Sequence, residues 1–136
     1  MKRRELAAGM TVALATLSAC RSAGGSPRGA AEHFLDEHYV RIDLKAAKAY
    51  ASGVALQKVE EEQRLVGDQQ IDASTRRPTV SYTLAEERPE GEDRATLVYD
   101  GKVRFDDGDT VELRWVLNTR RDADGEWKVS NYQEFQ

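Results

Sequence analysis

The chain has 136 residues, of which 40% are hydrophobic and 32% are charged, and its formal net charge at pH 7 is −4. This length and composition fit one compact domain with a short appendage and exclude two domains of ordinary size. The single cysteine excludes an intramolecular disulfide framework and a cysteine-based zinc knuckle. The longest uncharged run, residues 6–20, is shorter than the roughly 20 residues that a membrane-spanning helix needs.

The first twenty residues have the organisation of an export signal. Met1-Lys2-Arg3-Arg4 forms a basic start, residues 6–17 are apolar and rich in alanine, and Leu17-Ser18-Ala19-Cys20 closes the stretch. The closing residues resemble the lipobox of bacterial lipoproteins, and the resemblance implies that Cys20 receives a diacylglycerol and becomes the first residue after cleavage. The alternative is an ordinary secretory signal with an incidental cysteine. Arg3-Arg4 partly resembles a twin-arginine motif, so the Sec and Tat export routes both stay open.

The residues after Cys20 have the composition of a flexible tether, rich in Gly, Ser and Pro. We therefore divide the chain into a lipoprotein signal peptide (1–19), a lipidated cysteine with its tether (20–28) and one domain (29–136). The acyl chains implied for Cys20 hold a protein firmly on a membrane surface. An Asp directly after the lipidated cysteine would resemble an inner-membrane retention signal, but this sequence has Arg21 at that position. The expected location is the bacterial cell envelope, at the outer membrane and facing the periplasm in an organism with two membranes.

Nucleic acid is not an expected partner. Three basic residues and one acidic residue lie in the signal peptide, so its removal changes the net charge from −4 to −6. An acidic domain without a basic stripe lacks the charges that dominate binding to a phosphate backbone.

Helical periodicity dominates the first half of the domain. Apolar residues recur at helical spacing over residues 31–42, which predicts one helix. Asp43 is expected to cap a second, short helix whose inner face falls within residues 44–51, and a third helix is expected to end at Gly67. The polar residues 68–78 predict a connecting loop.

Strands follow, because the hydrophobic period changes from 3.6 to 2. One strand is expected from Thr79 to a turn at residues 86–91, and a long strand over residues 95–105. Asp100-Gly101 has the sequence of a tight hairpin turn. A turn there mixes apolar and charged groups on one face, so Gly101 is expected to mark a bend or a close backbone approach within a continuous strand.

Two three-residue loops that end in glycine are predicted to join the last three strands. The loop at residues 106–108 leaves every facing pair apolar or Gly, whereas the loop at residues 123–125 brings polar groups to the buried face. The expected facing pairs are Val103–Val111, Gly101–Leu113, Tyr99–Trp115 and Leu97–Leu117 for the first hairpin, and Thr119–Val129, Leu117–Asn131 and Trp115–Gln133 for the second.

This order of elements, closing on Asp124-Gly125-Glu126-Trp127-Lys128-Val129, resembles the NTF2-like (cystatin-like α+β) superfamily over residues 29–136. The resemblance implies an α+β fold in which N-terminal helices pack on a bent four-stranded antiparallel sheet and leave a conical pocket. The superfamily includes ketosteroid-isomerase-like and dehydratase-like enzymes, ligand-binding domains and secretion-system assembly domains. The fold by itself therefore does not decide the function.

Polar and aromatic side chains are expected to line the candidate pocket. The set is His38, Tyr50, Tyr82, Tyr99, Trp115, Asn131 and Gln133. In a small domain, Tyr and Trp are more often core residues with a polar tip at the rim. His38 shares its helical face with Phe34 and Leu35, where a structural histidine is more common than a catalytic one.

Catalytic and metal-binding residues are not assigned. An isomerase of this fold needs a carboxylate base in the pocket, but the acidic residues fall in turns or on outer helix faces. His33 and His38 lie about 140° apart around a helix, so they cannot ligate one ion. Residues 122–133 lack the Gly and the Glu that an EF-hand loop requires. We expect no metal and no cofactor.

The outer face of the predicted sheet carries charges that alternate along adjacent strands, and cross-strand charge pairing is their default explanation. Val98, Val116 and Tyr132 lie on the same face and form a candidate partner face for an envelope protein or a second copy. We therefore interpret the chain as a lipoprotein whose domain is a non-enzymatic binding or envelope-assembly module. The alternative is a ketosteroid-isomerase-like or dehydratase-like enzyme acting on a small hydrophobic ligand in the conical pocket.

Overall fold

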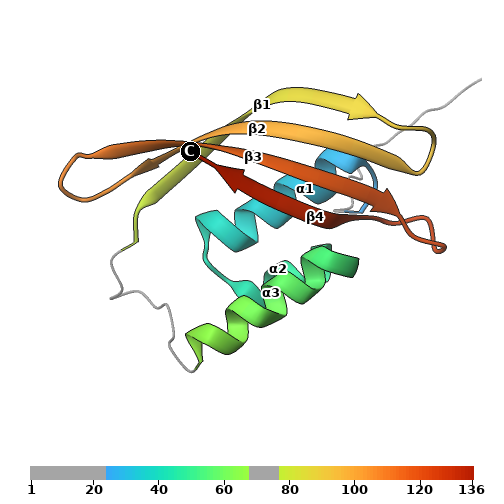
Figure 1. Ribbon diagram of the computed structural model, residues 1–136, viewed down its shortest axis with the longest axis horizontal. Helices are drawn as coiled ribbons and strands as arrows, with labels where there is room; N and C mark the ends of the chain where they lie inside the picture. Colours follow the sequence, from blue (N-terminus) through green and yellow to red (C-terminus); the bar gives the residue numbers. More distant parts are fainter. Residues whose placement is uncertain (1–23, 68–76) are drawn as a thin grey trace, which may run out of the picture.

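The computed structural model describes residues 24–67 and 77–136. The signal peptide (1–19), Cys20 and residues 68–76 of the expected loop lie outside the described residues. Helical segments come first and four strands follow, and Figure 1 shows the helices on one face of a curved sheet. Among the described residues, no helix has the length and apolar character needed to cross a membrane.

The first helix, α1 (Pro27–Leu35), begins within the stretch expected to be a tether. Its start is well defined, because the Ser26 hydroxyl accepts a hydrogen bond from the backbone amide of Gly29 at 2.9 Å and proline occupies the first helical position. A short π-helical turn, η1 (Asp36–Val40), continues α1, so helical structure ends two residues before the expected end at residue 42. His38 is the buried residue of this turn.

The next two helical segments match the predicted caps. Asp43 accepts a hydrogen bond from the amide of Ala46 at 3.0 Å and caps α2 (Leu44–Ala47), which runs into a 3-10 turn, η2 (Lys48–Tyr50). The longest helix, α3 (Gly53–Val66), ends at Gly67 as predicted. Gly67 adopts a φ of +68°, a left-handed conformation that glycine reaches without a steric penalty.

The four strands form one antiparallel sheet in the order β1-β2-β3-β4, and this confirms the predicted fold class. They are β1 (Thr79–Pro89), β2 (Arg94–Arg104), β3 (Thr110–Arg121) and β4 (Trp127–Phe135). β2 is continuous through Gly101, as predicted. The turn expected at residues 86–91 is wrong in part, because β1 continues to Pro89 after a register shift between Leu84 and Glu86.

The β2–β3 hairpin has the predicted register. Tyr99 faces Trp115, Leu97 faces Leu117, and the other two expected pairs are also present. The loop closes through a hydrogen bond from the Gly108 amide to the Phe105 carbonyl at 3.0 Å, with Gly108 at a φ of +93°. Uniform apolar pairing therefore selected the correct turn.

The predicted register of the β3–β4 hairpin holds only near its loop. Thr119 faces Val129 as expected, but a bulge shifts the register beyond that pair, so Leu117 faces Tyr132 and Trp115 faces Glu134. A one-residue shift moves every later side chain to the opposite face of the sheet. The predicted pairs Leu117–Asn131 and Trp115–Gln133 are therefore wrong.

The core lies between α1, α3 and the concave side of the sheet (Figure 1). The largest side chains with no exposed surface are Trp115, Tyr99, Phe34, Leu35, Leu97 and Leu117. The ring of Trp115 lies directly on the backbone of Gly101, where an added Cβ atom would be 2.1 Å from a ring carbon. The predicted close approach at Gly101 is therefore real, and its partner is an indole ring.

We predict that Gly101→Ala destabilises the domain by about 1–3 kcal/mol, because the new methyl group forces the fully buried Trp115 out of its place. Urea unfolding followed by tryptophan fluorescence measures the effect. Thr83→Ala, at an exposed position of β1, is the matched control and is expected to change the free energy of unfolding by less than about 0.5 kcal/mol. Equal stabilities for Gly101→Ala and the wild type would contradict the contact.

Candidate functional site

The aromatic residues expected to line a conical pocket instead fill the space between helices and sheet. Tyr99 and Trp115 have no exposed surface. The Tyr39 ring lies 4.7 Å from the Trp115 ring, and the Phe34 ring lies 4.9 Å from the Tyr132 ring. These contacts between α1, η1 and the sheet make the site a packed aromatic core.

The other predicted pocket residues are dispersed. Tyr82 lies half-buried on β1 with its ring at 90° to that of Tyr99, and Tyr50 lies against His33, with ring centroids 5.3 Å apart. Because of the β4 bulge, Asn131 faces Asn118 and Gln133 is exposed opposite Val116 on the outer side of the sheet. The placement of Asn131 and Gln133 in the interior is therefore wrong.

The same bulge changes the candidate partner face. Tyr132 is only 7% exposed and belongs to the core, so it does not lie beside Val98 and Val116. Val98 and Val116 do face each other across β2 and β3, both half-buried. No described helix covers their side of the sheet in Figure 1.

A network of His38, Glu62 and Tyr132 joins η1, α3 and β4. The Nε2 atom of His38 lies 2.8 Å from Oε1 of Glu62, and the Tyr132 hydroxyl donates to the same oxygen at 2.6 Å. Lys58 donates to the backbone carbonyl of Tyr132 at 2.7 Å and to the side chain of Asn131 at 2.9 Å. Polar groups of five residues from three elements thus anchor α3 to the edge strand of the sheet.

The geometry assigns the proton on His38. Nε2 faces a carboxylate oxygen that is an acceptor only, so Nε2 carries the hydrogen. Nδ1 is buried and has no hydrogen-bond partner among the described residues.

Glu62 is held in its charged form. Burial acts to raise its pKa, but hydrogen bonds from His38 and Tyr132, with the charges of His38 and Lys58, outweigh it and hold the pKa below its ordinary value. Burial and the bond to Glu62 raise the pKa of Tyr132 above its usual value. The site therefore joins an ionised carboxylate to a phenol that stays protonated, and these groups can position or accept a proton.

A second network lies on the opposite flank of α1. The Tyr99 hydroxyl donates to Glu32 at 3.1 Å, and the Tyr82 hydroxyl donates to Asp36 at 2.6 Å. Arg28 donates to the same oxygen of Glu32 at 2.7 Å. Burial and these acidic neighbours raise the pKa of both tyrosines, so both phenols stay neutral donors.

Sequence reasoning missed the carboxylates of both networks. Glu32 and Asp36 were placed on an outer helix face, yet both reach tyrosine hydroxyls of the sheet. Glu62 follows the buried Val59 by three positions, so helical spacing alone was a signal that it borders the inner face. Its partners His38 and Tyr132 are distant in sequence and offered no signal.

A metal centre is not indicated in the part of the chain that the structure describes, where no group of three or more His, Cys, Asp or Glu side chains is placed to hold an ion.

Comparison with solved structures identifies the fold as NTF2-like. A protein designated a calcium/calmodulin-dependent protein kinase type II association domain, from Thiobacillus denitrificans, has a TM-score of 0.62 at 15% identity, covering 82% of this chain and 94% of its own. A ketosteroid isomerase-like protein from Erwinia carotovora atroseptica has a TM-score of 0.57 at 16% identity, covering 85% and 96%.

An NTF-2 like protein of unknown function from Shewanella oneidensis has a TM-score of 0.52 at 13% identity, covering 80% of this chain and 98% of its own. No protein-family model and no curated protein matches the sequence. At these identities the likeness establishes the fold and leaves the function open.

We predict that Glu62→Gln lowers the free energy of unfolding by about 1 kcal/mol at pH 7, because it removes the charged acceptor of two hydrogen bonds. The folded pKa of Glu62 lies below its unfolded value of about 4.3, so this stabilisation is present above that value and is lost as pH falls through the folded pKa. Urea unfolding between pH 7 and pH 3 is expected to show the difference between variant and wild type shrinking.

Glu61→Gln is the matched control on the same helix, since Glu61 is exposed and pairs only with the exposed Arg64 among the described residues. A Glu62→Gln difference that stays constant over the pH range, or a Glu61→Gln effect of the same size, would count against the network.

Proposed function

We propose that the chain is a lipoprotein anchored through Cys20 in the bacterial cell envelope, and that its NTF2-like domain is a non-enzymatic binding or assembly module. The filled interior carries the proposal. Trp115, Tyr99 and Phe34 have no exposed surface, so they occupy the space in which this fold would hold a small hydrophobic ligand. The outer face of the sheet, which no described helix covers, is then the broad surface left for a partner.

The export signal supports the anchor. A basic start, an apolar stretch and Leu17-Ser18-Ala19-Cys20 occur in the order of a lipoprotein signal, and Cys20 is the only cysteine of the chain. In the folded domain, the carbonyl of Gly24 accepts a hydrogen bond from the amide of Trp127 at 2.8 Å. Four residue steps from Gly24 to Cys20 span at most about 14 Å, so the lipid would hold this end of the sheet close to the membrane surface.

Val98 and Val116 support a docking role for the outer face. They are apolar, half-buried and directly opposed, and the flanking pair Asp100–Arg114 forms an exposed ion pair at 2.9 Å. An apolar centre with a charged surround is the usual composition of a protein interface. The partner is an envelope protein or a second copy of the chain.

An enzymatic function is the second candidate, because Glu62 supplies the carboxylate that sequence reasoning did not place. Its bond to His38 resembles an acid–base pair. Two features weigh against catalysis. Nε2 of His38 and Oε1 of Glu62 are already engaged with each other, and packed aromatic rings surround His38, with the Phe34 ring 5.3 Å away and the Tyr39 ring 4.2 Å away. A substrate would have to displace this packing to reach the imidazole.

We predict that Cys20→Ser abolishes lipid attachment, because the serine hydroxyl cannot form the thioether. The full chain is expressed in a diderm bacterium, and the expected result is loss of the lipid mass and release from the membrane fraction. Ser22→Ala is the matched control and is expected to stay lipidated. A Cys20→Ser protein with unchanged mass and partition would rule out the anchor.

We predict that the double variant Val98→Glu, Val116→Glu disrupts the assembly formed through the outer face of the sheet. Burying two carboxylates at an apolar contact carries a large desolvation cost. Light scattering of the detergent-solubilised full chain, combined with cross-linking in the intact envelope, measures the assembled state. Val54→Glu is the control, since Val54 is 49% exposed on α3. An assembly that is identical in the double variant and the wild type would exclude this face.

A further inference from the structure

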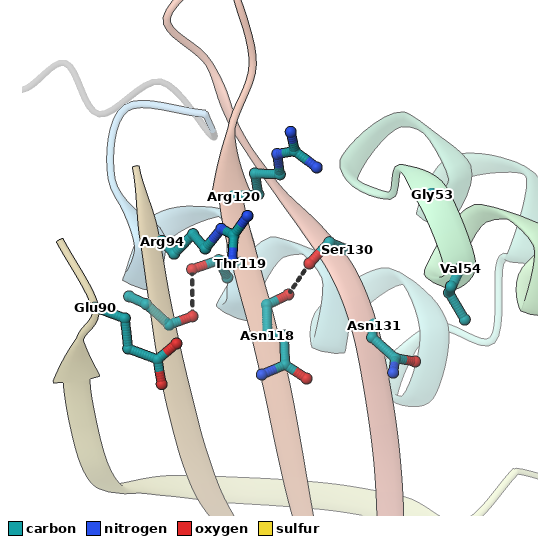
Figure 2. Close-up of a pocket in the computed structure, with 10 residues that line it drawn as sticks. Gly53, Val54, Glu90, Arg94, Asn118, Thr119, Arg120, Ser130 and Asn131 are labelled. Carbon is teal, nitrogen blue, oxygen red and sulfur yellow. Dashed lines mark hydrogen bonds between the residues drawn. The ribbon is translucent and has the colours of Figure 1, made fainter. Parts of the chain in front are cut away.

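A hollow of about 400 Å³ lies at the end of the sheet where the β1–β2 turn and the β3–β4 hairpin meet (Figure 2). It is separate from the aromatic interior and from the Val98–Val116 pair. Arg94 and Arg120 line it from adjacent strands, Ser130 and Asn131 line it from β4, and the start of α3 closes one side. The remaining lining residues are Glu90, Ala95, Asn118 and Thr119.

The two arginines carry positive charge that the described part of the protein does not neutralise. Arg94 and Arg120 are direct cross-strand partners, an arrangement that is unfavourable for like charges. The neighbouring basic residues are paired, Arg121 with Asp93 at 3.1 Å and Lys128 with Asp122 at 3.6 Å. Among the described residues, no carboxylate lies within ion-pair distance of Arg94 or Arg120.

Among the described residues that line the hollow, Glu90 is the one carboxylate, and it is engaged elsewhere. It accepts a hydrogen bond from Thr96 at 3.1 Å and lies 4.0 Å from the guanidinium of Arg88. Arg94 and Arg120, two exposed cross-strand partners that both line the hollow, therefore point to a negatively charged ligand.

Further donors lie around the same hollow. The side-chain oxygen of Asn131 accepts from Lys58 and from the amide of Tyr132, so its NH₂ group is the part left for a ligand. Ser52 makes no side-chain cap, and the amides of Gly53 and Val54 belong to the first turn of α3, where they have no intrahelical acceptor. These groups supplement the arginine pair, which supplies the main attraction.

We propose that this hollow binds a phosphate group that carries an organic substituent. A carboxylate has two oxygens and is satisfied by one guanidinium, whereas a phosphate presents enough oxygens for two guanidiniums and an amide. A hollow of about 400 Å³ falls in the ordinary range of small-molecule sites, so it has room for the substituent as well.

Two sources supply this chemistry, a free phosphomonoester and a phospholipid headgroup. The headgroup source rests on the proposed anchor. The carbonyl of Gly24 accepts a hydrogen bond from the amide of Trp127, and the next residue, Lys128, is the cross-strand partner of Arg120. The lipid on Cys20 would thus hold the hollow near the membrane surface. The phosphomonoester source does not depend on the anchor.

The test is calorimetric titration of the full-length chain in a non-ionic detergent at low ionic strength, with glycerol 3-phosphate as the probe. Arg94→Gln and Arg120→Gln are each expected to weaken binding at least tenfold. Arg104→Gln is the matched control, because Arg104 is exposed on the same face of β2 as Arg94 but lies at the opposite end of that strand. The probe is also expected to raise the Tm of the wild type and of Arg104→Gln, but not of the other two variants.

Soluble dihexanoyl-phosphatidylglycerol, below its micelle concentration, distinguishes the sources. Tighter binding of this lipid than of glycerol 3-phosphate, lost in Arg94→Gln, assigns the site to a headgroup, and the reverse order assigns it to a free phosphomonoester. Absence of binding by both probes, or equal weakening in Arg104→Gln, overturns the proposal. The lipid mass at Cys20 is a separate measurement, so failure of the anchor and failure of the phosphate site give different results.

Discussion

One extra residue in β4 determines how the helices attach to the sheet. The bulge beyond Val129 turns Tyr132 toward the core, where its hydroxyl meets Glu62 and its ring packs on Phe34. Without the bulge, Asn131 would point inward and Tyr132 outward. The bulge therefore places a phenol under α3 and an amide at the edge of the sheet, and it separates an aromatic interior from a polar exterior.

Carboxylates have different roles on the two sides of the sheet. On the helical side, Glu32 and Glu62 accept hydrogen bonds from the hydroxyls of Tyr99 and Tyr132. These largely buried hydroxyls therefore have hydrogen-bond partners. On the other side, carboxylates pair with Arg88, Arg114 and Lys128, whereas no described carboxylate lies within ion-pair distance of the cross-strand partners Arg94 and Arg120. An acidic protein thus keeps a local positive centre, and this centre supports the proposed anionic ligand despite the negative net charge.

The NTF2-like fold is shared by proteins with different designations, so it does not by itself assign a function. Structures of this shape include a kinase association domain and a ketosteroid isomerase-like protein, and each is about as distant from this chain as the other. In this molecule the fully buried Trp115 ring lies on the backbone of Gly101 and fills part of the interior between helices and sheet. The surface features, namely the opposed valines and the opposed arginines, therefore carry the functional proposals.

The sequence by itself determined the elements whose signals are local. Asp43 and Gly67 marked helix ends, and the alternation around Gly101 excluded a false hairpin, because caps and side-chain periodicity depend only on neighbouring residues. The predicted export signal that ends at Cys20 also depends only on neighbouring residues. Only the tertiary structure decided the β4 bulge and the partners of Glu62, since a bulge leaves no mark in a period-2 pattern and a hydrogen bond between distant elements depends on how they pack.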